Sequence, residues 1–334
     1  MTANRVWTPD VLEGFEQSEL ELPDGAVATL VRMRQDAAAA VGAPKAGQTA
    51  GPERGIDRPA VLYLHGYVDY FFQTHLAAAF EARGYRFYAI DLRGYGRSLG
   101  RGVGPELENF VPEISVYAQD LDAAAKAIAQ EQGSDRLVGL GHSTGGLIMP
   151  LWAATRPGRL EALVLNSPWL DLNGNWFMRG PATRAIQLLA RIAPKAAISA
   201  LHVHYGRALH KDTGGEWDYD LTWKPHDGFK AGLPWLASIR RWQARAQQGL
   251  NIKEPVLVMT SARRGDPAHW HQELLTTDSI LDPRQMWRWA PRLGDDVEVR
   301  ALEGGTHDLT LSPEPVRSRF MEETIDWLDR ITAA

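Results

Sequence analysis

The stretch Gly141-His142-Ser143-Thr144-Gly145 follows an apolar run, Leu137–Leu140, and precedes a helical pattern over residues 146–154. A bare G-x-S-x-G match means little in a chain with 31 glycines. With a strand before it and a helix after it, the same pattern is typical of a nucleophile elbow, a sharp turn that exposes a serine hydroxyl. The two glycines suit a tight turn in which side chains would collide with the adjoining strand and helix. The positive end of the following helix stabilises negative charge beside the serine, so the stretch predicts that Ser143 is a nucleophile.

Composition excludes several classes of function. The chain has 334 residues, 44% of them hydrophobic, a formal net charge of -5 and no cysteine. Disulfides, thiolate catalysis and cysteine-ligated metals are therefore excluded, and the scattered basic residues give no reason to expect a nucleic-acid partner. Residues 1–20 lack the basic-then-apolar pattern of a signal peptide, and no apolar run is long enough to cross a bilayer. We expect a cytoplasmic protein without stable membrane insertion.

Short apolar runs alternate with helical patterns along most of the chain, which predicts a mostly parallel sheet flanked by helices. The expected strands are 28–33, 60–64, 85–90, 137–140, 160–165, 255–259 and 297–302, and the expected helices include 73–83, 114–132, 147–155 and 313–331. Residues 167–252 interrupt this alternation with a tryptophan-rich, mostly helical segment. We therefore expect a core made of residues 1–166 and 253–334, with residues 167–252 inserted as a lid above the carboxyl ends of the strands. Its aromatic residues, among them Trp169 and Trp176, are candidates to line an apolar substrate cleft or to form the lid's own core.

A serine nucleophile needs a base, and the base needs a group that orients it. His307 stands in a glycine-flanked loop directly after the run 297–302, at the end of the chain order Ser, acid, His that this kind of site follows. The acid should follow the strand 255–259, where Asp266, Asp278 and Asp282 are all candidates. One donor for the oxyanion should be the backbone N–H of Thr144, the residue after the nucleophile.

Four motifs together resemble the α/β-hydrolases, and within them the monoacylglycerol lipase and lysophospholipase-like group. They are His65-Gly66-Tyr67, the run Asp91–Ser98, the elbow itself, and the terminal Gly304-x-x-His307-Asp308. The resemblance implies the α/β-hydrolase fold with a helical lid, and it implies that Tyr67 supplies the second oxyanion N–H. It also implies that the acid opens an Asp-x-x-x-Asp-Pro stretch, which selects Asp278 in Asp278-Ser279-Ile280-Leu281-Asp282-Pro283.

The chain departs from the family pattern between Ser261 and Thr277, where the loop before the acid is expanded. If that expansion is not real, Asp266 is the acid, whereas Asp282 suits the N-cap of the helix that follows it. Phe71 follows the oxyanion loop and is a candidate either for the acyl pocket or for packing against the next helix. The pair His269 and His271 lacks the further ligands of a metal site, so we expect no metal and no cofactor.

These observations predict a serine hydrolase that cleaves carboxylic esters through an acyl-enzyme, with Ser143, His307 and Asp278 as its triad. The aromatic insertion and the resemblance suggest a small substrate with an apolar acyl group, such as a monoacylglycerol, a lysophospholipid or a simple ester. An aminopeptidase, thioesterase or lactonase of the same fold, or a non-catalytic ligand-binding member, is the alternative. The acidic residues Glu216, Asp218 and Asp220 would be candidates to bind a free amino group in an aminopeptidase. The oligomeric state is left open by the sequence.

Overall fold

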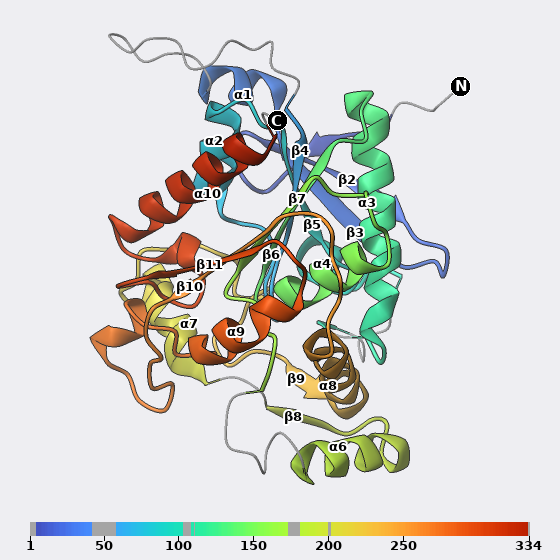
Figure 1. The fold of residues 1–334 in the computed structure, drawn as a ribbon, viewed down its shortest axis with the longest axis vertical. Helices are drawn as coiled ribbons and strands as arrows, with labels where there is room; N and C mark the ends of the chain where they lie inside the picture. Colours follow the sequence, from blue (N-terminus) through green and yellow to red (C-terminus); the bar gives the residue numbers. More distant parts are fainter. Residues whose placement is uncertain are drawn as a thin grey trace.

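The strand that leads into Ser143 lies in the middle of a nine-stranded sheet (Figure 1). The computed structural model describes residues 5–41, 58–102, 108–109, 111–172, 181–199 and 202–332. Within these residues the spatial order of the strands is β1-β2-β3-β5-β4-β6-β7-β10-β11. The strands are β1 (Thr8–Pro9), β2 (Phe15–Glu21), β3 (Val27–Met33), β4 (Ala60–Leu64), β5 (Phe87–Asp91), β6 (Leu137–His142), β7 (Ala162–Asn166), β10 (Val256–Ser261) and β11 (Val297–Leu302). The strands from β5 across to β11 are parallel, and β1, β2 and β3 join one edge in antiparallel pairs.

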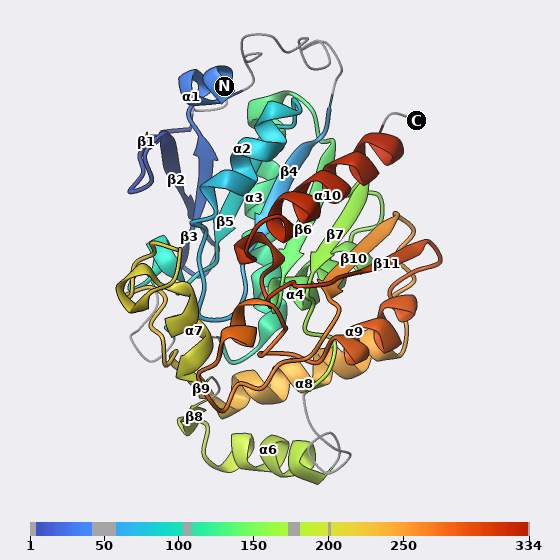
Figure 2. The same ribbon diagram turned by 90° about the vertical axis from the view of Figure 1, so that its left-hand side faces the viewer.

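Helices cover both faces of the sheet (Figures 1 and 2). One face carries α1 (Gln35–Val41), α2 (Thr74–Ala82) and α10 (Val316–Thr332), and the other carries α3 (Tyr117–Gln132), α4 (Gly145–Ala154) and α8 (Leu233–Gln247). Successive side chains of a strand point to opposite faces. In β4, Val61 and Tyr63 accordingly pack with α2 and α10, whereas Leu62 and Leu64 pack with α3, α4 and α8. Burial on both faces explains why the parallel strands read as nearly continuous apolar runs.

The strands and helices expected from the sequence are all present, with boundaries that differ by a few residues. The chain leaves the sheet after β7 and returns with β10, and the segment between them contains α6 (Pro181–Ile192), β8 (Ala197–Ser199), α7 (Val203–Leu209) and β9 (Lys230–Gly232) before α8. Strands β8 and β9 form a separate antiparallel pair. Figure 2 shows α6, β8 and α8 gathered at one end of the molecule. This is the segment that the sequence predicts to be a lid, and both the lid and the three-part division of the chain stay predictions.

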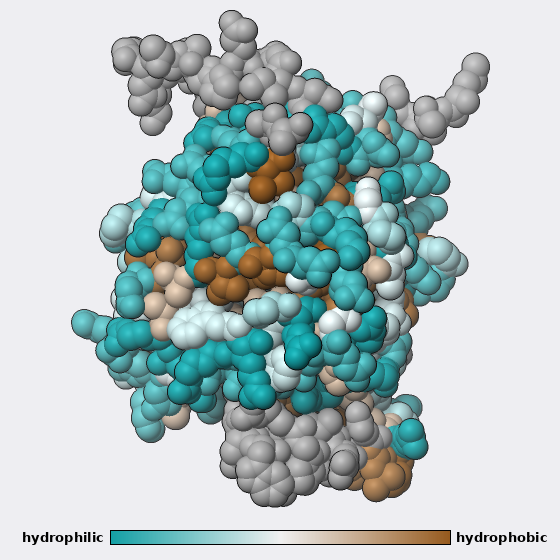
Figure 3. Space-filling view, in the orientation of Figure 1, coloured by the Kyte–Doolittle hydropathy of each residue, from teal (hydrophilic) through white to brown (hydrophobic). Residues whose placement is uncertain are grey.

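Apolar side chains are exposed at the same end of the molecule. On α6 and β8, the side chains of Leu188, Leu189, Ile192 and Ile198 are all at least 48% exposed. Figure 3 shows a hydrophobic area at the lower end of the surface, where Figure 1 places these elements. None of the helices in the described part of the chain has both the length and the apolar character needed to cross a membrane.

Candidate active site

The turn between β6 and α4 holds Ser143 in a strained backbone conformation. Its φ is 52°, in the left-handed region that a residue other than glycine rarely adopts. A Cβ on Gly145 would lie 2.5 Å from the carbonyl oxygens of Leu64 and His65, and a Cβ on Gly141 would lie 2.6 Å from that of Gly145. Only glycine fits these two positions, because the turn packs against backbone on both sides. The expected elbow is therefore present, with Ser143 at its tip.

Three side chains from distant parts of the chain form a hydrogen-bonded row at this turn. Nε2 of His307 lies 3.0 Å from Oγ of Ser143, and Nδ1 of His307 lies 2.9 Å from Oδ2 of Asp278. His307 follows β11, and Asp278 lies in the loop after β10. All three side chains are buried, with Asp278 completely so. In this arrangement an imidazole can take the serine proton while a carboxylate holds the other ring nitrogen.

The structure separates the three candidate acids. The other carboxylate oxygen of Asp278 accepts hydrogen bonds from the backbone N–H groups of Ile280 and Leu281, at 3.0 and 2.7 Å. Asp266 is exposed, and its side chain accepts a hydrogen bond from a backbone N–H in its own loop. Asp282 caps α9 (Pro283–Trp289) by accepting the N–H of Arg284 at 3.1 Å. Of the three, Asp278 is the one that the fold brings to His307.

The loop after β4 comes close enough to Ser143 to supply an oxyanion donor. A Cβ on Gly66 would lie only 3.1 Å from the Cβ of Ser143, so the loop backbone passes directly over the nucleophile. Tyr67 and Thr144 line the same pocket as Ser143. The Tyr67 side chain is held away from the nucleophile, because its hydroxyl donates to the carbonyl of Phe229 at 2.8 Å and its ring packs against Trp235 in a tilted arrangement. The backbone of this loop is thus available to the site.

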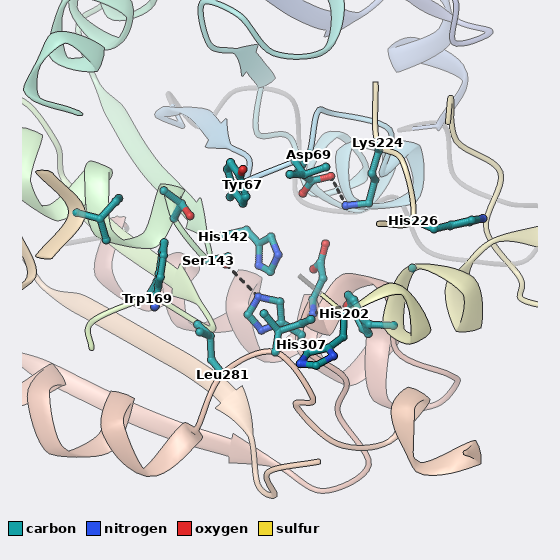
Figure 4. Close-up of a pocket in the computed structure, with 18 of the residues that line it drawn as sticks. Tyr67, Asp69, His142, Ser143, Trp169, His202, Lys224, His226, Leu281 and His307 are labelled. Atoms are coloured by element: carbon teal, nitrogen blue, oxygen red, sulfur yellow. Dashed lines mark hydrogen bonds and ion pairs between the residues drawn. The ribbon is translucent and has the colours of Figure 1, made fainter. Parts of the chain in front are cut away.

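A cavity of about 350 Å³ opens above Ser143 and His307, a size typical of small-ligand sites. Figure 4 shows Trp169 and Leu281 on one side of the serine, and Asp69, Lys224, His226 and His202 on the other. The Trp169 side adjoins α8, because Gln243 of that helix donates to the Trp169 carbonyl at 2.9 Å. Further apolar residues that line the cavity are Leu172, Ile186, Ile198, Leu236, Ile239 and Ile280, and α8 also contributes the buried Arg240, which pairs with Asp171. The cavity therefore has an apolar half and a polar, charged half, with the nucleophile between them.

Of the three aromatic residues proposed to bind substrate, Trp169 lines the cavity. Trp176 lies outside the described residues. Phe71 is fully buried in the core on the α2 face of the sheet, where its ring contacts Phe15 and Phe87. Its backbone N–H donates to Asp91, which fixes the loop so that the ring faces the sheet. The expectation that Phe71 lines the acyl pocket was therefore wrong, and its other interpretation, packing against the next helix, agrees with its place in the buried cluster that includes Leu76 and Phe80 of α2.

A second set of hydrogen-bonded polar groups is centred on Asp308, the residue that follows His307 in the sequence. Asp308 accepts hydrogen bonds from Asn166, Gln73 and Thr310, at 2.7 to 3.0 Å. Burial raises the pKa of Asp308, but the nearby His142 and the hydrogen bonds from Thr310 and Gln73 outweigh burial and hold it below its usual value. This carboxylate fastens the loop of His307 to the end of β7 and to the start of α2.

Asp69, His142 and Asp308 also bring one ligand-type atom each within 4.8 Å of one another, a spacing that could hold a metal ion. The ammonium group of Lys224 already lies 2.6 Å from Asp69, and both oxygens of Asp308 accept hydrogen bonds from protein donors. Burial lowers the pKa of His142, and its Nδ1 lies 3.2 Å from the carbonyl of Asn166, an acceptor that favours a proton on that nitrogen. The proton on Nδ1 leaves the lone pair of Nε2 free, but both carboxylates are already engaged by protein donors, so these groups fit an internal network of hydrogen bonds and ion pairs better than a metal centre.

Comparison with known proteins agrees with this geometry. Residues 56–263 match the family described as serine aminopeptidase, S33. The chain belongs to this family of α/β-hydrolases. It is 28% identical over 275 residues to a monoacylglycerol lipase of Mycolicibacterium smegmatis, which covers 81% of this chain and 88% of that protein. Its fold is similar to the monoacylglycerol lipase of Paleococcus ferrophilus, with a TM-score of 0.61 and 21% identity over 84% of this chain and 96% of the other. It is also similar to a monoglyceride lipase of Saccharomyces cerevisiae, with a TM-score of 0.59 and 16% identity over 98% and 96% of the two chains.

The predicted α/β-hydrolase fold is thus confirmed, and this α/β-hydrolase is a serine hydrolase of carboxylic esters. Sequence reasoning did not single out Asp69, Lys224 or Asp308 as members of the site. Asp308 had a signal, because it directly follows His307. Lys224 had none, since it lies 155 positions from its partner Asp69 in a segment without a motif.

Proposed function

We propose that this α/β-hydrolase cleaves small esters of apolar carboxylic acids, such as monoacylglycerols, lysophospholipids or simple esters, through an acyl-enzyme on Ser143. The row Ser143–His307–Asp278, with distances of 3.0 and 2.9 Å, carries the proposal because it lies at the floor of a cavity with an apolar half. The monoacylglycerol lipases to which the chain is similar support the choice of substrate. A cytoplasmic location without stable membrane insertion remains the prediction from the sequence.

The reaction begins when Nε2 of His307 takes the proton of the Ser143 hydroxyl as its oxygen attacks the ester carbonyl. Asp278 accepts the Nδ1–H of His307 and stabilises the imidazolium that forms. The backbone N–H groups of Tyr67 and Thr144 donate hydrogen bonds to the negatively charged oxygen of the tetrahedral intermediate. His307 then returns the proton to the leaving alcohol, and a water molecule activated by the same imidazole releases the acid.

The polarity of the cavity orients the substrate. An acyl chain gains free energy by leaving water, so it should occupy the half lined by Trp169 and Leu281. The alcohol then lies in the other half, beside Asp69 and Lys224. This assignment places the leaving group where hydroxyl groups can be hydrogen-bonded.

The aminopeptidase alternative finds no unengaged carboxylate at the site among the residues that the structure describes. The acidic residues Glu216, Asp218 and Asp220, which were candidates to bind an amino group, are exposed and are not among the residues that line the cavity. Arg317 pairs with the first of them and Lys211 with the second. Asp69 and Asp308 do line the cavity, but Lys224 already neutralises the first, and hydrogen bonds from protein side chains engage both oxygens of the second. Ester hydrolysis is therefore the better supported activity.

A fluorophosphonate probe tests the nucleophile, because it labels only an activated serine. We expect labelling of the native protein and none of Ser143→Ala. Ser167→Ala is a matched control, since Ser167 is a buried serine at the end of the next strand whose hydroxyl has no hydrogen-bond partner among the described residues. Rates on p-nitrophenyl esters of increasing chain length then test the acyl preference. A well-folded protein that resists the probe, or one that strongly prefers acetate, contradicts the proposal.

A further inference from the structure

Lys224 fills a site in the polar half of the cavity that has the chemistry of a cation-binding cage. Its ammonium nitrogen lies 2.6 Å from Oδ1 of Asp69 and 5.6 and 5.7 Å from the ring centroids of Phe72 and Tyr219. The two rings also pack against each other, with centroids 5.1 Å apart and planes inclined at 46°. Only 15% of the Lys224 side chain and 2% of that of Asp69 are exposed. One carboxylate and two aromatic rings therefore surround a single, largely desolvated positive charge.

A carboxylate combined with aromatic rings is the arrangement by which proteins bind the ammonium group of a ligand. In this chain the occupant is a lysine of the protein itself. Lys224 comes from the lid segment, whereas Asp69 belongs to the loop after β4 that also carries Tyr67. Asp69, Lys224 and Tyr219 all line the cavity above Ser143 (Figure 4). The cage therefore opens on the place where the leaving alcohol would lie.

The charges around the cage argue against a role for Lys224 as a receptor for anions. Its ammonium is already paired with Asp69, and a second carboxylate, that of Asp308, lies close to Asp69. The imidazoles of His142 and His226 add no fixed positive charge, because burial lowers the pKa of both. A phosphate placed here would meet two carboxylates and one ammonium that is already neutralised. The surroundings suit a neutral polar group, and they would suit a cation if Lys224 were absent.

We propose that Lys224 sets the charge preference of the leaving-group half of the cavity. Its ammonium fills the cage formed by Asp69, Phe72 and Tyr219, so that esters of neutral alcohols are accepted and esters of ammonium-bearing alcohols are excluded. Removing the Lys224 side chain leaves the cage and its carboxylate open to a quaternary ammonium group. The inference rests on the proposed ester hydrolysis and narrows its alcohol class to uncharged alcohols, so that monoacylglycerols and simple esters remain as substrates and lysophospholipids, whose alcohol carries a charged phosphate, do not.

Two esters of the same acid test this preference, because choline butyrate and 3,3-dimethylbutyl butyrate have the same shape and differ in charge. The measured quantity is the ratio of kcat/KM for the choline ester to kcat/KM for the neutral ester. In Lys224→Ala we expect this ratio to rise about tenfold, which corresponds to about 1.4 kcal/mol. Lys211→Ala is the matched control, since this lid lysine also pairs with an aspartate at 2.6 Å but does not line the cavity. Its ratio should equal that of the native enzyme.

The double variant Asp69→Asn/Lys224→Ala should return the ratio to the native value, because the cage has then lost its carboxylate. Asp69→Asn alone should lower the ratio, since an unpaired ammonium then repels choline, and this variant serves if Lys224→Ala does not fold. An unchanged ratio in a folded, active Lys224→Ala enzyme overturns the proposal, as does a raised ratio that survives in the double variant. If the native enzyme hydrolyses neither ester, the proposed function fails. Calorimetric titration with tetramethylammonium then tests the cage, and it should show binding to Lys224→Ala but not to the native or double-variant protein.

Discussion

Replacing Asp278 with asparagine should trap His307 in a form that cannot act as a base. Oδ1 of Asp278 accepts the N–H groups of Ile280 and Leu281, and Oδ2 faces Nδ1 of His307. The amide oxygen of an asparagine would have to take the place of Oδ1, because only an acceptor satisfies two N–H donors. Its NH₂ group would then face Nδ1 of His307 and force the proton of the ring onto Nε2. That nitrogen could only donate to Ser143, so the serine would keep its proton.

The hydrogen bonds of the site set the size of the effect. To restore the working tautomer, the asparagine must flip and turn its NH₂ group against the two backbone N–H groups. Leaving two buried donors without acceptors costs about 2–6 kcal/mol in total. At about 1.36 kcal/mol per factor of ten, this corresponds to a fall in kcat of roughly 30- to 25,000-fold. Loss of the charge that stabilises the imidazolium adds to it, so we expect the upper part of this range.

The assay is steady-state hydrolysis of a p-nitrophenyl ester, with thermal unfolding as the test of folding. Asp282→Asn and Asp266→Asn are the matched controls, since they make the same chemical change nearby. Asparagine caps a helix as well as aspartate does, and Asp266 is exposed, so both variants should keep kcat within about twofold. If a well-folded Asp278→Asn enzyme stays within tenfold of the native kcat while Asp266→Asn loses activity, the assignment of the acid is wrong.

Two further predictions concern the support of the site. In Gly145→Ala, the new methyl group would lie 2.5 Å from the carbonyl oxygens of Leu64 and His65, so the oxyanion loop must shift; we expect a loss of about 1–3 kcal/mol in unfolding free energy together with most of the activity, and full activity with an unchanged melting temperature would contradict this. Asp308 has a pKa held below its usual value, so its carboxylate adds stability that is present above the unfolded pKa of about 3.9 and lost as the pH falls through the folded pKa. In urea unfolding, Asp308→Asn should therefore be less stable than the native protein at pH 7, and the gap should narrow toward pH 3; a gap that does not depend on pH would refute the role given to this charge.

The site residues that could be predicted from the sequence share one property: each lies in the loop or turn that follows a strand. Ser143 follows β6, His307 follows β11, and the oxyanion loop follows β4. Strands of a parallel sheet end at a common edge, so a local pattern already implies that these residues meet. Asp278 has no such signal, since it lies in an expanded loop well beyond the end of β10 at Ser261. Asp278 was selected by resemblance. In the structure, an isolated parallel β-bridge pairs its backbone with that of Arg264, which lies just after β10.

The features that could not be predicted depend on contacts between distant segments. Strand β2 was missed because its sequence, Phe15–Glu21, buries only part of its residues and reads as polar. The sequence could not decide between the two interpretations of Phe71, because its position after the oxyanion loop is known but the direction of its ring depends on what packs around it. The ion pair of Asp69 with Lys224 joins residues 155 positions apart. No local pattern of charge or hydrophobicity marks such a pair.

The origin of each group suggests that chemistry and selectivity can be changed separately in this enzyme. Ser143, His307 and Asp278 are held by loops that follow strands of the core, whereas Lys224 comes from the lid segment, and its hydrogen bond goes to Asp69 and not to any of the three. Loss of the Asp278 carboxylate affects proton transfer, which every ester requires, so it should lower the rates on the choline and the neutral ester by the same factor. Loss of the Lys224 ammonium changes only what the leaving alcohol meets, so it should change the ratio of the two rates. A triad variant that altered this ratio would mean that the leaving-group half and the proton-transfer row are not independent.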